Sequence, residues 1–210
     1  MRADFDSWAE ARGLRALVSE EQVAKLRTYV ELLTLWNAKV NLTGFSLTED
    51  MDEALDRLIL EPTSAASLLP KSIQSVVDVG SGGGSPALPL AVAAPWLSFT
   101  LVESSIRKCV FLKEAIRSMG LPSARVIAER IETMAGAANH QTFDAATIRA
   151  VRLDSAIVGQ LSTLVRPGGL LIYFDQAGHE PLKGWPGFPF LNTKQVEGVA
   201  WRLSIYQRTP

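Results

Sequence analysis

Residues 76–86, VVDVGSGGGSP, join a short apolar run to a turn that is rich in glycine. The run at residues 76–79 has the length and the β-branched composition of a buried strand. Gly80, Gly82 and Gly84 follow it directly, and glycine permits a positive φ and a close approach of the backbone to a ligand. A tight strand-to-helix connection without a ligand is the alternative. A glycine-rich turn directly after a strand favours a nucleotide-like ligand.

Downstream of this turn, short apolar runs alternate with segments of helical length. We expect strands at residues 75–79, 99–102, 125–128, 145–148 and 170–174, and helices at 86–94, 105–119, 131–138 and 153–165. This alternation predicts an α/β fold with a parallel, doubly wound, Rossmann-like sheet whose ligand lies at the carboxyl ends of the strands. A segment rich in Pro and Gly follows, and residues 200–206 then predict a terminal antiparallel strand at the edge of the sheet.

The residues before the first strand predict helices. Residues 19–22, SEEQ, read as a capping box, and apolar residues recur at helical spacing up to position 40. Gly44 suits a left-handed end for this helix. A second helix is expected from Thr48 to about position 60, where Pro62 ends or interrupts it. We therefore expect a helical extension over residues 1–74 and a Rossmann-like domain over residues 75–210, which together form one compact unit.

Composition narrows the class of protein. The chain of 210 residues is 47% hydrophobic and 20% charged, as folded proteins are. It begins without the apolar core of a secretory signal and has no apolar run of membrane length, so we expect a cytoplasmic protein, which we favour as a monomer. One cysteine and two histidines argue against disulfides and a structural zinc site. The net charge of −1 attracts no polyanion as a whole, so a nucleic-acid substrate would need a local basic patch.

The residues around the turn distinguish between nucleotides. Ser85 stands where the dinucleotide fingerprint requires a third glycine, and Pro86 removes one of the N–H groups that a diphosphate would need. Asp78, at the end of the strand, would repel a diphosphate but attract an ammonium group. S-adenosylmethionine carries an ammonium and a sulfonium and no phosphate. These residues therefore favour S-adenosylmethionine over NAD.

Further polar residues end the next two strands. Glu103, followed by Ser104, lies about 20 residues beyond the glycines, where a carboxylate accepts both ribose hydroxyls. A solvated charge at the end of a strand is the alternative. After the third strand, the adenine is expected beside Arg130, Ile131 and Glu132. A surface charge pair is the alternative there.

With these residues in place, the sequence resembles the GidB/RsmG family of 16S rRNA guanine-N7 methyltransferases between about residues 23 and 174. The resemblance rests on WNAKVNLT at residues 36–43, DVGSGGGSP at 78–86, LVES at 101–104, RIE at 130–132, and Phe143-Asp144 with Arg149-Ala150. The motif at residues 36–43 is the most specific, because ordinary methyltransferases do not carry it before the glycine turn.

The resemblance implies a class I S-adenosylmethionine-dependent methyltransferase fold with an N-terminal helical cap. It also implies methylation of N7 of a guanine in 16S rRNA, free or within the small ribosomal subunit, without a general base. Arg149 matches an arginine that is expected to face the substrate, and it is the candidate catalytic residue. Its alternative role is a salt bridge to Asp144 or Asp154.

The sequence departs from the family pattern mainly on the substrate side. Leu58 replaces a histidine, Asp175 replaces a lysine, and Trp201-Arg202 stands where Arg-His is expected. An acid at position 175 would repel RNA phosphate. Two alternatives to rRNA methylation therefore stay open: a methyltransferase for a less anionic substrate, and a non-catalytic protein associated with the ribosome.

Overall fold

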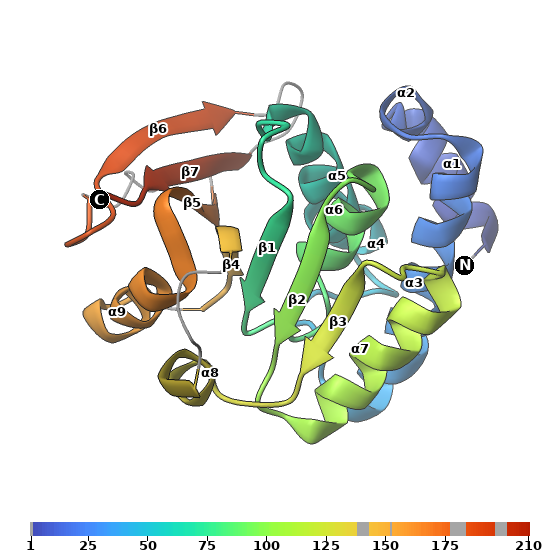
Figure 1. The fold of residues 1–210 in the computed structure, drawn as a ribbon. Coiled ribbons are helices and arrows are strands. Elements are labelled where there is room, and N and C mark those ends of the chain that lie inside the picture. Colours follow the sequence, from blue (N-terminus) through green and yellow to red (C-terminus); the bar gives the residue numbers. More distant parts are fainter. Residues whose placement is uncertain (1, 138–142, 152, 177–183, 196–200) are drawn as a thin grey trace.

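A mixed β-sheet forms the centre of the protein (Figure 1). The computed structural model describes residues 2–137, 143–151, 153–176, 184–195 and 201–210. Within these residues the sheet has seven strands in the order β3-β2-β1-β4-β5-β7-β6. The strands are β1 (Ser75–Val79), β2 (Ser98–Val102), β3 (Ala124–Ile127), β4 (Phe143–Arg149), β5 (Val165–Gln176), β6 (Phe190–Gln195) and β7 (Trp201–Gln207).

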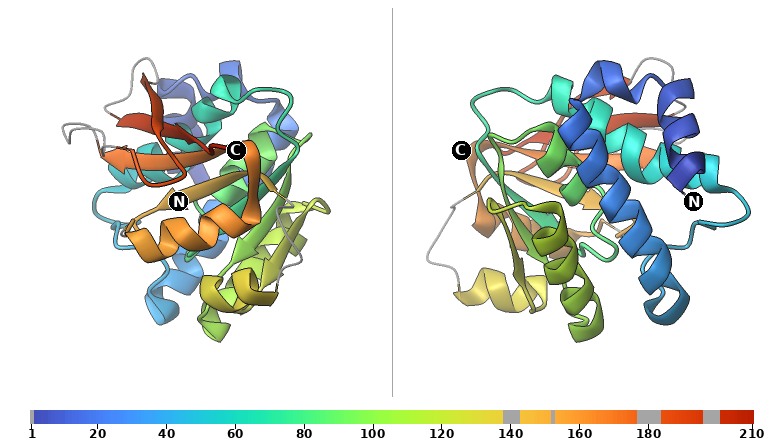
Figure 2. Two further views of the ribbon diagram at one scale, coloured as in Figure 1. Left: turned by 60° about the vertical axis from the view of Figure 1, so that its left-hand side comes forward. Right: turned by 90° about the vertical axis from the view of Figure 1, so that its right-hand side faces the viewer.

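Helices cover both faces of the sheet (Figures 1 and 2). The helical elements are α1 (Arg2–Ala11), α2 (Leu14–Leu17), α3 (Glu20–Val40), α4 (Met51–Leu55), the π-helix η1 (Asp56–Leu60), α5 (Glu61–Ala65), the 3-10 helix η2 (Ala66–Leu68), α6 (Ala87–Ala93), α7 (Ile106–Met119), α8 (Ile131–Ala137) and α9 (Ser155–Leu164). Each described helix is too short or too polar to cross a membrane.

The central strand β1 is buried on both faces. Val76 packs into a core shared with α3, α6 and α7, whereas Val77 packs into a second core shared with α8 and α9. Successive side chains of a strand point to opposite faces, so a continuous apolar run is what such a strand needs. The predicted α/β fold with a doubly wound sheet is confirmed.

The pairing of β1 places the site. It runs parallel to β2 and β4, with Val79 beside Val102 on one side and beside Ile148 on the other. The three strands therefore end at the same level. The segments that follow them, which begin at Gly80, Glu103 and the last residue of β4, Arg149, lie side by side at one edge of the sheet.

The prediction for the end of the sheet needs a correction. The terminal strand β7 is antiparallel to β5 as expected, but it does not form the edge. β6 pairs with its other side and is the edge strand. The sequence did not indicate β6, because its Phe190 and Leu191 are exposed and show no buried alternation.

The predicted helix ends were also partly wrong. The capping box at Ser19 is present, but α3 ends at Val40 and Asn41, not Gly44, takes the left-handed conformation. Asn37 supports this end, because its Oδ1 accepts hydrogen bonds from the N–H groups of Leu42 and Thr43 at 2.6 and 2.9 Å. Asn37 and residues 41–43 of the WNAKVNLT motif thus determine the shape of the loop that follows α3.

The second predicted helix starts later and continues further than expected. It begins at Met51 rather than Thr48, passes through the π-helix η1, and continues as α5. Pro62 does not end it: the proline is the second residue of α5 and follows directly on the π-helix η1.

The N-terminal helix α1, which the sequence did not predict, is tied to η1. The side chains of Trp8 and Arg12 both donate to the carboxylate of Asp56, Trp8 Nε1 at 2.8 Å and Arg12 through two nitrogens at 2.7 and 2.9 Å. These contacts fix the first residue of η1 from outside the sheet.

Candidate functional site

The glycine turn is held by its own backbone. Gly80 has a φ of +68°, and a Cβ there would lie 2.6 Å from Val151 Cγ2, so no other residue fits without displacement. Four N–H groups of the turn already donate hydrogen bonds. Those of Gly80 and Ser81 donate to the carbonyl of Val102, that of Gly82 donates to the Glu103 carboxylate, and that of Gly84 donates to the carbonyl of Ser81. These groups are not free to cradle a phosphate.

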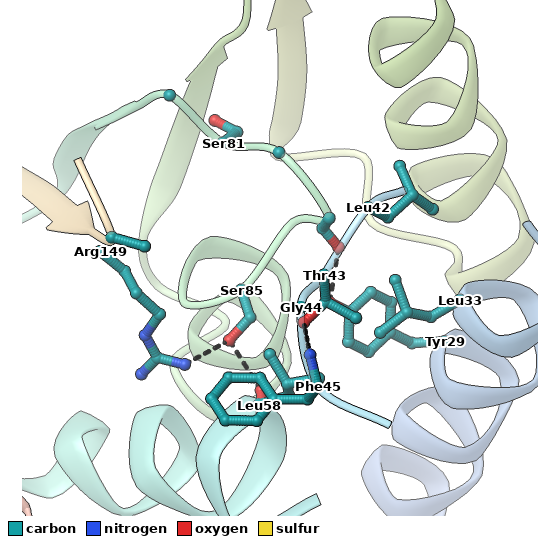
Figure 3. A pocket seen from close by; sticks show the side chains of 14 residues that line it. Tyr29, Leu33, Leu42, Thr43, Gly44, Phe45, Leu58, Ser81, Ser85 and Arg149 are labelled. Carbon is teal, nitrogen blue, oxygen red and sulfur yellow. Dashed lines mark hydrogen bonds between the residues drawn. The ribbon is translucent and has the colours of Figure 1, made fainter. Parts of the chain in front are cut away.

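The loop after α3 packs directly on this turn. Tyr29 Oη donates to the carbonyl of Gly83 at 2.6 Å, and a Cβ on Gly83 would lie 2.9 Å from the carbonyl oxygen of Leu42 (Figure 3). A glycine is needed here because two backbones approach each other. The helical residues before the sheet therefore form one wall of the site.

Asp78 lies beneath the turn and is almost fully buried. Its Oδ1 accepts a hydrogen bond of 2.6 Å from Thr147, whereas Oδ2 has no partner among the residues that the structure describes. Burial raises the pKa of Asp78 to about 6, although the hydrogen bond from Thr147 lowers it. A buried carboxylate oxygen without a partner is costly, and a cation bound nearby would relieve that cost.

Glu103 joins the glycine turn to α7. Its Oε2 accepts from Gly82 N at 2.9 Å and its Oε1 from Ser105 N at 2.8 Å. The backbone carbonyl of Glu103 accepts from Cys109 Sγ, and burial raises the pKa of this thiol. Cys109 is thus a packed, buried side chain. Each oxygen of Glu103 keeps a further lone pair for a ligand.

A first cavity, of about 170 Å³, lies beside Glu103. Most residues that the sequence assigned to the cofactor line it, namely Gly80, Glu103, Ser104, Arg130, Ile131 and Glu132. Val151 and Ile157 contribute apolar surface, so the cavity combines a carboxylate with an apolar floor.

A second cavity, of about 180 Å³, lies on the other side of the turn (Figure 3). Gly80 and Gly82 line it together with Arg149 and with the loop after α3, including Phe45. Leu58, which replaces the histidine of the family pattern, contributes an apolar wall. Gly80 lines both cavities, so one lies on each side of that residue. Asp78 and Gly84 lie behind the turn and line neither; a Cβ on Gly84 would meet Leu88 at 2.6 Å.

Arg149 lines the second cavity, but its guanidinium is held by the protein. Nη2 binds Glu61 Oε2 at 2.6 Å, and Nη1 donates to the carbonyl of Arg57 at 2.5 Å and to Ser85 Oγ at 2.9 Å. The guanidinium also lies 4.9 Å from the ring centroid of Phe174. Burial lowers the pKa of Arg149, and Glu61 opposes that shift. Arg149 therefore connects β4, η1 and the glycine turn.

The predicted alternative partners of Arg149 are wrong. Asp144 binds Arg166 at 2.6 Å and accepts from the N–H groups of residues 74 and 75. Partial burial raises its pKa, but these hydrogen bonds hold the pKa of Asp144 down at about 2. Asp154 caps the N-terminus of α9. Asp144 lies at the opposite end of β4 from Arg149, and the side chain of Asp154 is used by the helix cap.

Sequence reasoning missed Glu61 and Ser85. Glu61 is fully buried and pairs with Arg149 across 88 residues of sequence. Its only signal is an acid within the otherwise apolar and small residues 58–66. Ser85, noted only as a missing glycine, donates to the carbonyl of Leu58 at 2.8 Å. The side chains at the departures Asp175 and Trp201-Arg202 lie outside what the structure describes.

The fold and this arrangement define a class I S-adenosylmethionine-dependent methyltransferase fold: a glycine turn after the central strand, an acid after the next strand, and a seventh strand antiparallel to the fifth. A solved structure of a SAM-dependent methyltransferase from Aquifex aeolicus is similar. It superposes with a TM-score of 0.55 at 15% identity and covers 75% of this chain and 93% of that chain.

Sequence comparison identifies the family. The model of the family GidB, rRNA small subunit methyltransferase G, matches residues 22–181. Proteins named Ribosomal RNA small subunit methyltransferase G are 35% identical over 74% of this chain in Chloroflexus aggregans and 38% identical over 70% of it in Stenotrophomonas maltophilia. The matched part covers 64% and 66% of those two relatives, which is less than two thirds of their length. The chain belongs to the GidB family, as the resemblance predicted.

Proposed function

We propose that the protein transfers a methyl group from S-adenosylmethionine to N7 of a guanine in 16S ribosomal RNA. The observation that carries this proposal is that Gly80 lines both cavities and lies between them. One offers a carboxylate and an apolar floor for an adenosine, and the other offers an apolar and aromatic wall for a base. The names of the relatives support a small-subunit RNA as the substrate. The reaction then takes place in the cytoplasm, where ribosomes assemble.

The residues of the first cavity fit S-adenosylmethionine. The glycine turn uses its N–H groups internally, which suits a ligand without phosphate. Glu103 has lone pairs for the ribose hydroxyls. Behind the turn and outside the cavity, Asp78 Oδ2 lacks a partner, which an ammonium group would supply directly or through water. When bound, S-adenosylmethionine supplies the electrophilic methyl group. Gly80 separates the adenosine side from the base side, so the methyl group is expected beside it.

The second cavity contains no group suited to be a general base. The described residues that line it include no carboxylate, histidine, cysteine or lysine. Burial raises the pKa of the Tyr29 phenol, whose hydroxyl donates to Gly83. Guanine N7 has an in-plane lone pair and needs no deprotonation before it attacks a methyl carbon. The lining therefore suits direct displacement, in which the protein aligns the base and excludes water.

Arg149 acts in this proposal as a positioning residue. Its bonds to Ser85 and to the carbonyl of Arg57 hold the glycine turn against η1, and Leu58 in η1 forms the apolar wall. The two terminal nitrogens of the guanidinium already bind these internal partners. The expected substrate-facing role thus becomes one of setting the distance between the two walls of the cavity.

Cofactor affinity is expected to depend on the ionisation of Asp78. Its pKa of about 6 means that the carboxylate is ionised above pH 6, where it attracts the ammonium group, and neutral below. Affinity should therefore be full at pH 7.5 and fall as the pH drops below 6, by at most about tenfold in all, the loss expected for a neutral side chain at this position. Calorimetry between pH 5 and pH 7.5 measures this.

The matched control is Asp78→Asn, which keeps the shape and cannot ionise. At pH 7.5 it should bind the cofactor about tenfold more weakly than the original protein, about 1.4 kcal/mol. Its affinity should change little between pH 5 and pH 7.5. A variant that shows the same pH dependence as the original protein would assign the titration to another group, such as one of the two histidines.

The function itself is tested by the position of the transferred methyl group. Purified protein is incubated with S-adenosylmethionine labelled in the methyl group and with 16S rRNA or small ribosomal subunits that lack the modification. Mass spectrometry of nuclease digests should find the label in 7-methylguanosine at one site. Tight cofactor binding with no label in rRNA would contradict the proposal and favour a different substrate or a non-catalytic protein.

A further inference from the structure

Most basic side chains that the structure describes have a partner. Acids hold eight of them, among them Arg12, Lys25 and Arg117, and others contact a carbonyl, a hydroxyl or an aromatic ring. In the described part of the chain, the basic side chains without a hydrogen bond, ion pair or ring contact are Lys39, Arg107, Lys108, Lys113 and Arg130. Unpaired cations therefore concentrate in a few segments.

Four of these five cations lie on two adjacent helices. α3 and α7 lie side by side (Figure 2), and the ring of Trp36 lies 5.9 Å from that of Phe111. This contact brings the last turn of α3, which carries Lys39, to the first turns of α7, which carry Arg107 and Lys108. Lys113 lies one to two turns further along α7. We call the surface around these helix ends the α3–α7 face; it carries Lys39 and Arg107, with Lys108 and Lys113 on different sides of α7.

The segment that follows α3 lines the second cavity, and the segment that precedes α7 lines the first. Lys39 is three residues before Leu42, which lines the second cavity, and Arg107 is three residues after Ser104, which lines the first. Side chains of a helix point towards its N-terminus, so Arg107 and Lys108 lean towards the cavity edge. The fifth cation, Arg130, lies across the first cavity between two acids of its own segment.

The neighbouring acids do not neutralise this face. Glu114 on α7 is occupied by Arg117 at 2.7 Å. Glu31 lies on the same stripe of α3 as Lys39 but eight residues earlier, about 12 Å along the helix. Exposed apolar side chains lie among the cations instead: Ile106 is 65% exposed and Val110 49%. Aliphatic groups between unpaired cations suit a strand with charged phosphates and apolar sugar and base faces.

We propose that the α3–α7 face binds the phosphate backbone of the RNA strand that carries the target base. The inference rests on the proposed function and adds the surface by which a chain of net charge −1 holds a polyanion. An RNA strand that places a base in the second cavity must continue past the edge of that cavity. The α3–α7 face supplies cations there. An acidic protein surface is the competing occupant, and the experiment distinguishes it.

The experiment removes charge from this face and compares it with an equal loss elsewhere. One variant carries Arg107→Gln and Lys113→Gln, and a second carries all four changes to Gln. The matched control carries Lys25→Gln and Arg117→Gln, two cations on the same two helices that are paired with Glu21 and Glu114. Binding of a labelled 16S rRNA fragment is measured by fluorescence anisotropy between 50 and about 200 mM salt, and cofactor affinity by calorimetry.

A protein that makes fewer phosphate contacts releases fewer counterions on binding. The variant with all four substitutions should therefore bind RNA at least thirtyfold more weakly than the original protein at low salt. Its slope of log affinity against log salt should fall by about three, since each contact contributes about 0.7 to 0.9. The double variant should lose about half of this slope. The control should stay within twofold of the original protein, and cofactor affinity should be unchanged in all variants.

The outcomes separate the two proposals. If the fourfold variant keeps the affinity and the salt slope of the original protein while that protein methylates rRNA, the α3–α7 face is wrong and the proposed function stands. If the original protein neither binds nor methylates rRNA, the proposed function fails. If polyglutamate of equal charge displaces RNA from the original protein as well as unlabelled RNA does, the face is an acidic-polypeptide surface and the RNA assignment is overturned.

Discussion

Replacing Arg149 with methionine should lower the free energy of unfolding by about 3 to 5 kcal/mol. The change leaves Glu61, which is fully buried, with its charge uncompensated except by Arg57, whose Nη1 lies 3.5 Å from Glu61 Oε2. It also removes the bonds to Ser85 and to the carbonyl of Arg57. Urea unfolding at pH 7 followed by circular dichroism measures the loss.

Two further variants show whether the loss comes from the ion pair. Arg117→Met breaks an exposed pair with Glu114 that solvent screens, and it should leave the free energy of unfolding nearly unchanged. The double variant Arg149→Met with Glu61→Met removes both buried charges and should recover most of the stability lost by Arg149→Met alone, because no charge is left unpaired. Equal costs for Arg149→Met and Arg117→Met would show that the buried pair does not hold the fold.

Replacing Glu103 with alanine should weaken cofactor binding about 100-fold, or about 3 kcal/mol. The carboxylate is the acceptor that we assign to the ribose hydroxyls, and its loss also leaves the N–H groups of Gly82 and Ser105 without their partner. Calorimetric titration with S-adenosylmethionine gives the change in affinity, and thermal unfolding checks that the variant is folded.

The control for this change is another carboxylate on the same cavity. Glu129 is exposed and lines the cavity without a described hydrogen bond, so Glu129→Ala should change the affinity by less than about threefold. Similar effects of the two changes would mean that the cavity acts through its general charge, and that the ribose is held elsewhere.

The sequence predicts the elements whose own residues determine them. β1 has the predicted bounds and α7 begins within one residue of its prediction, because each carries a complete apolar pattern ended by glycine. α1 and β6 were missed because their positions depend on distant partners. Asp56 holds α1 through Trp8 and Arg12, and β7 holds β6, and neither contact leaves a periodic pattern in the sequence.

The same distinction holds for the site. Gly80, Glu103 and the residues after β3 were predicted to lie together, because parallel strands bring their carboxyl ends to one edge. The partner of Arg149 was not predictable in this way. The π-helix η1 inserts an extra residue into its turn and so changes which face the following residues present, and Glu61 comes directly after it. Periodicity counted along an ordinary α-helix does not anticipate that shift.

The hydrogen bonds from Trp8 and Arg12 of α1 to Asp56 limit how far this protein can be shortened. The family match begins at residue 22, and a domain boundary drawn there would discard Trp8 and Arg12. Asp56 would then lose the donors that anchor η1, two residues before Leu58 and one before the carbonyl that Arg149 binds. The smallest unit that preserves the wall of the proposed substrate cavity therefore starts before the region that the family model matches, at α1.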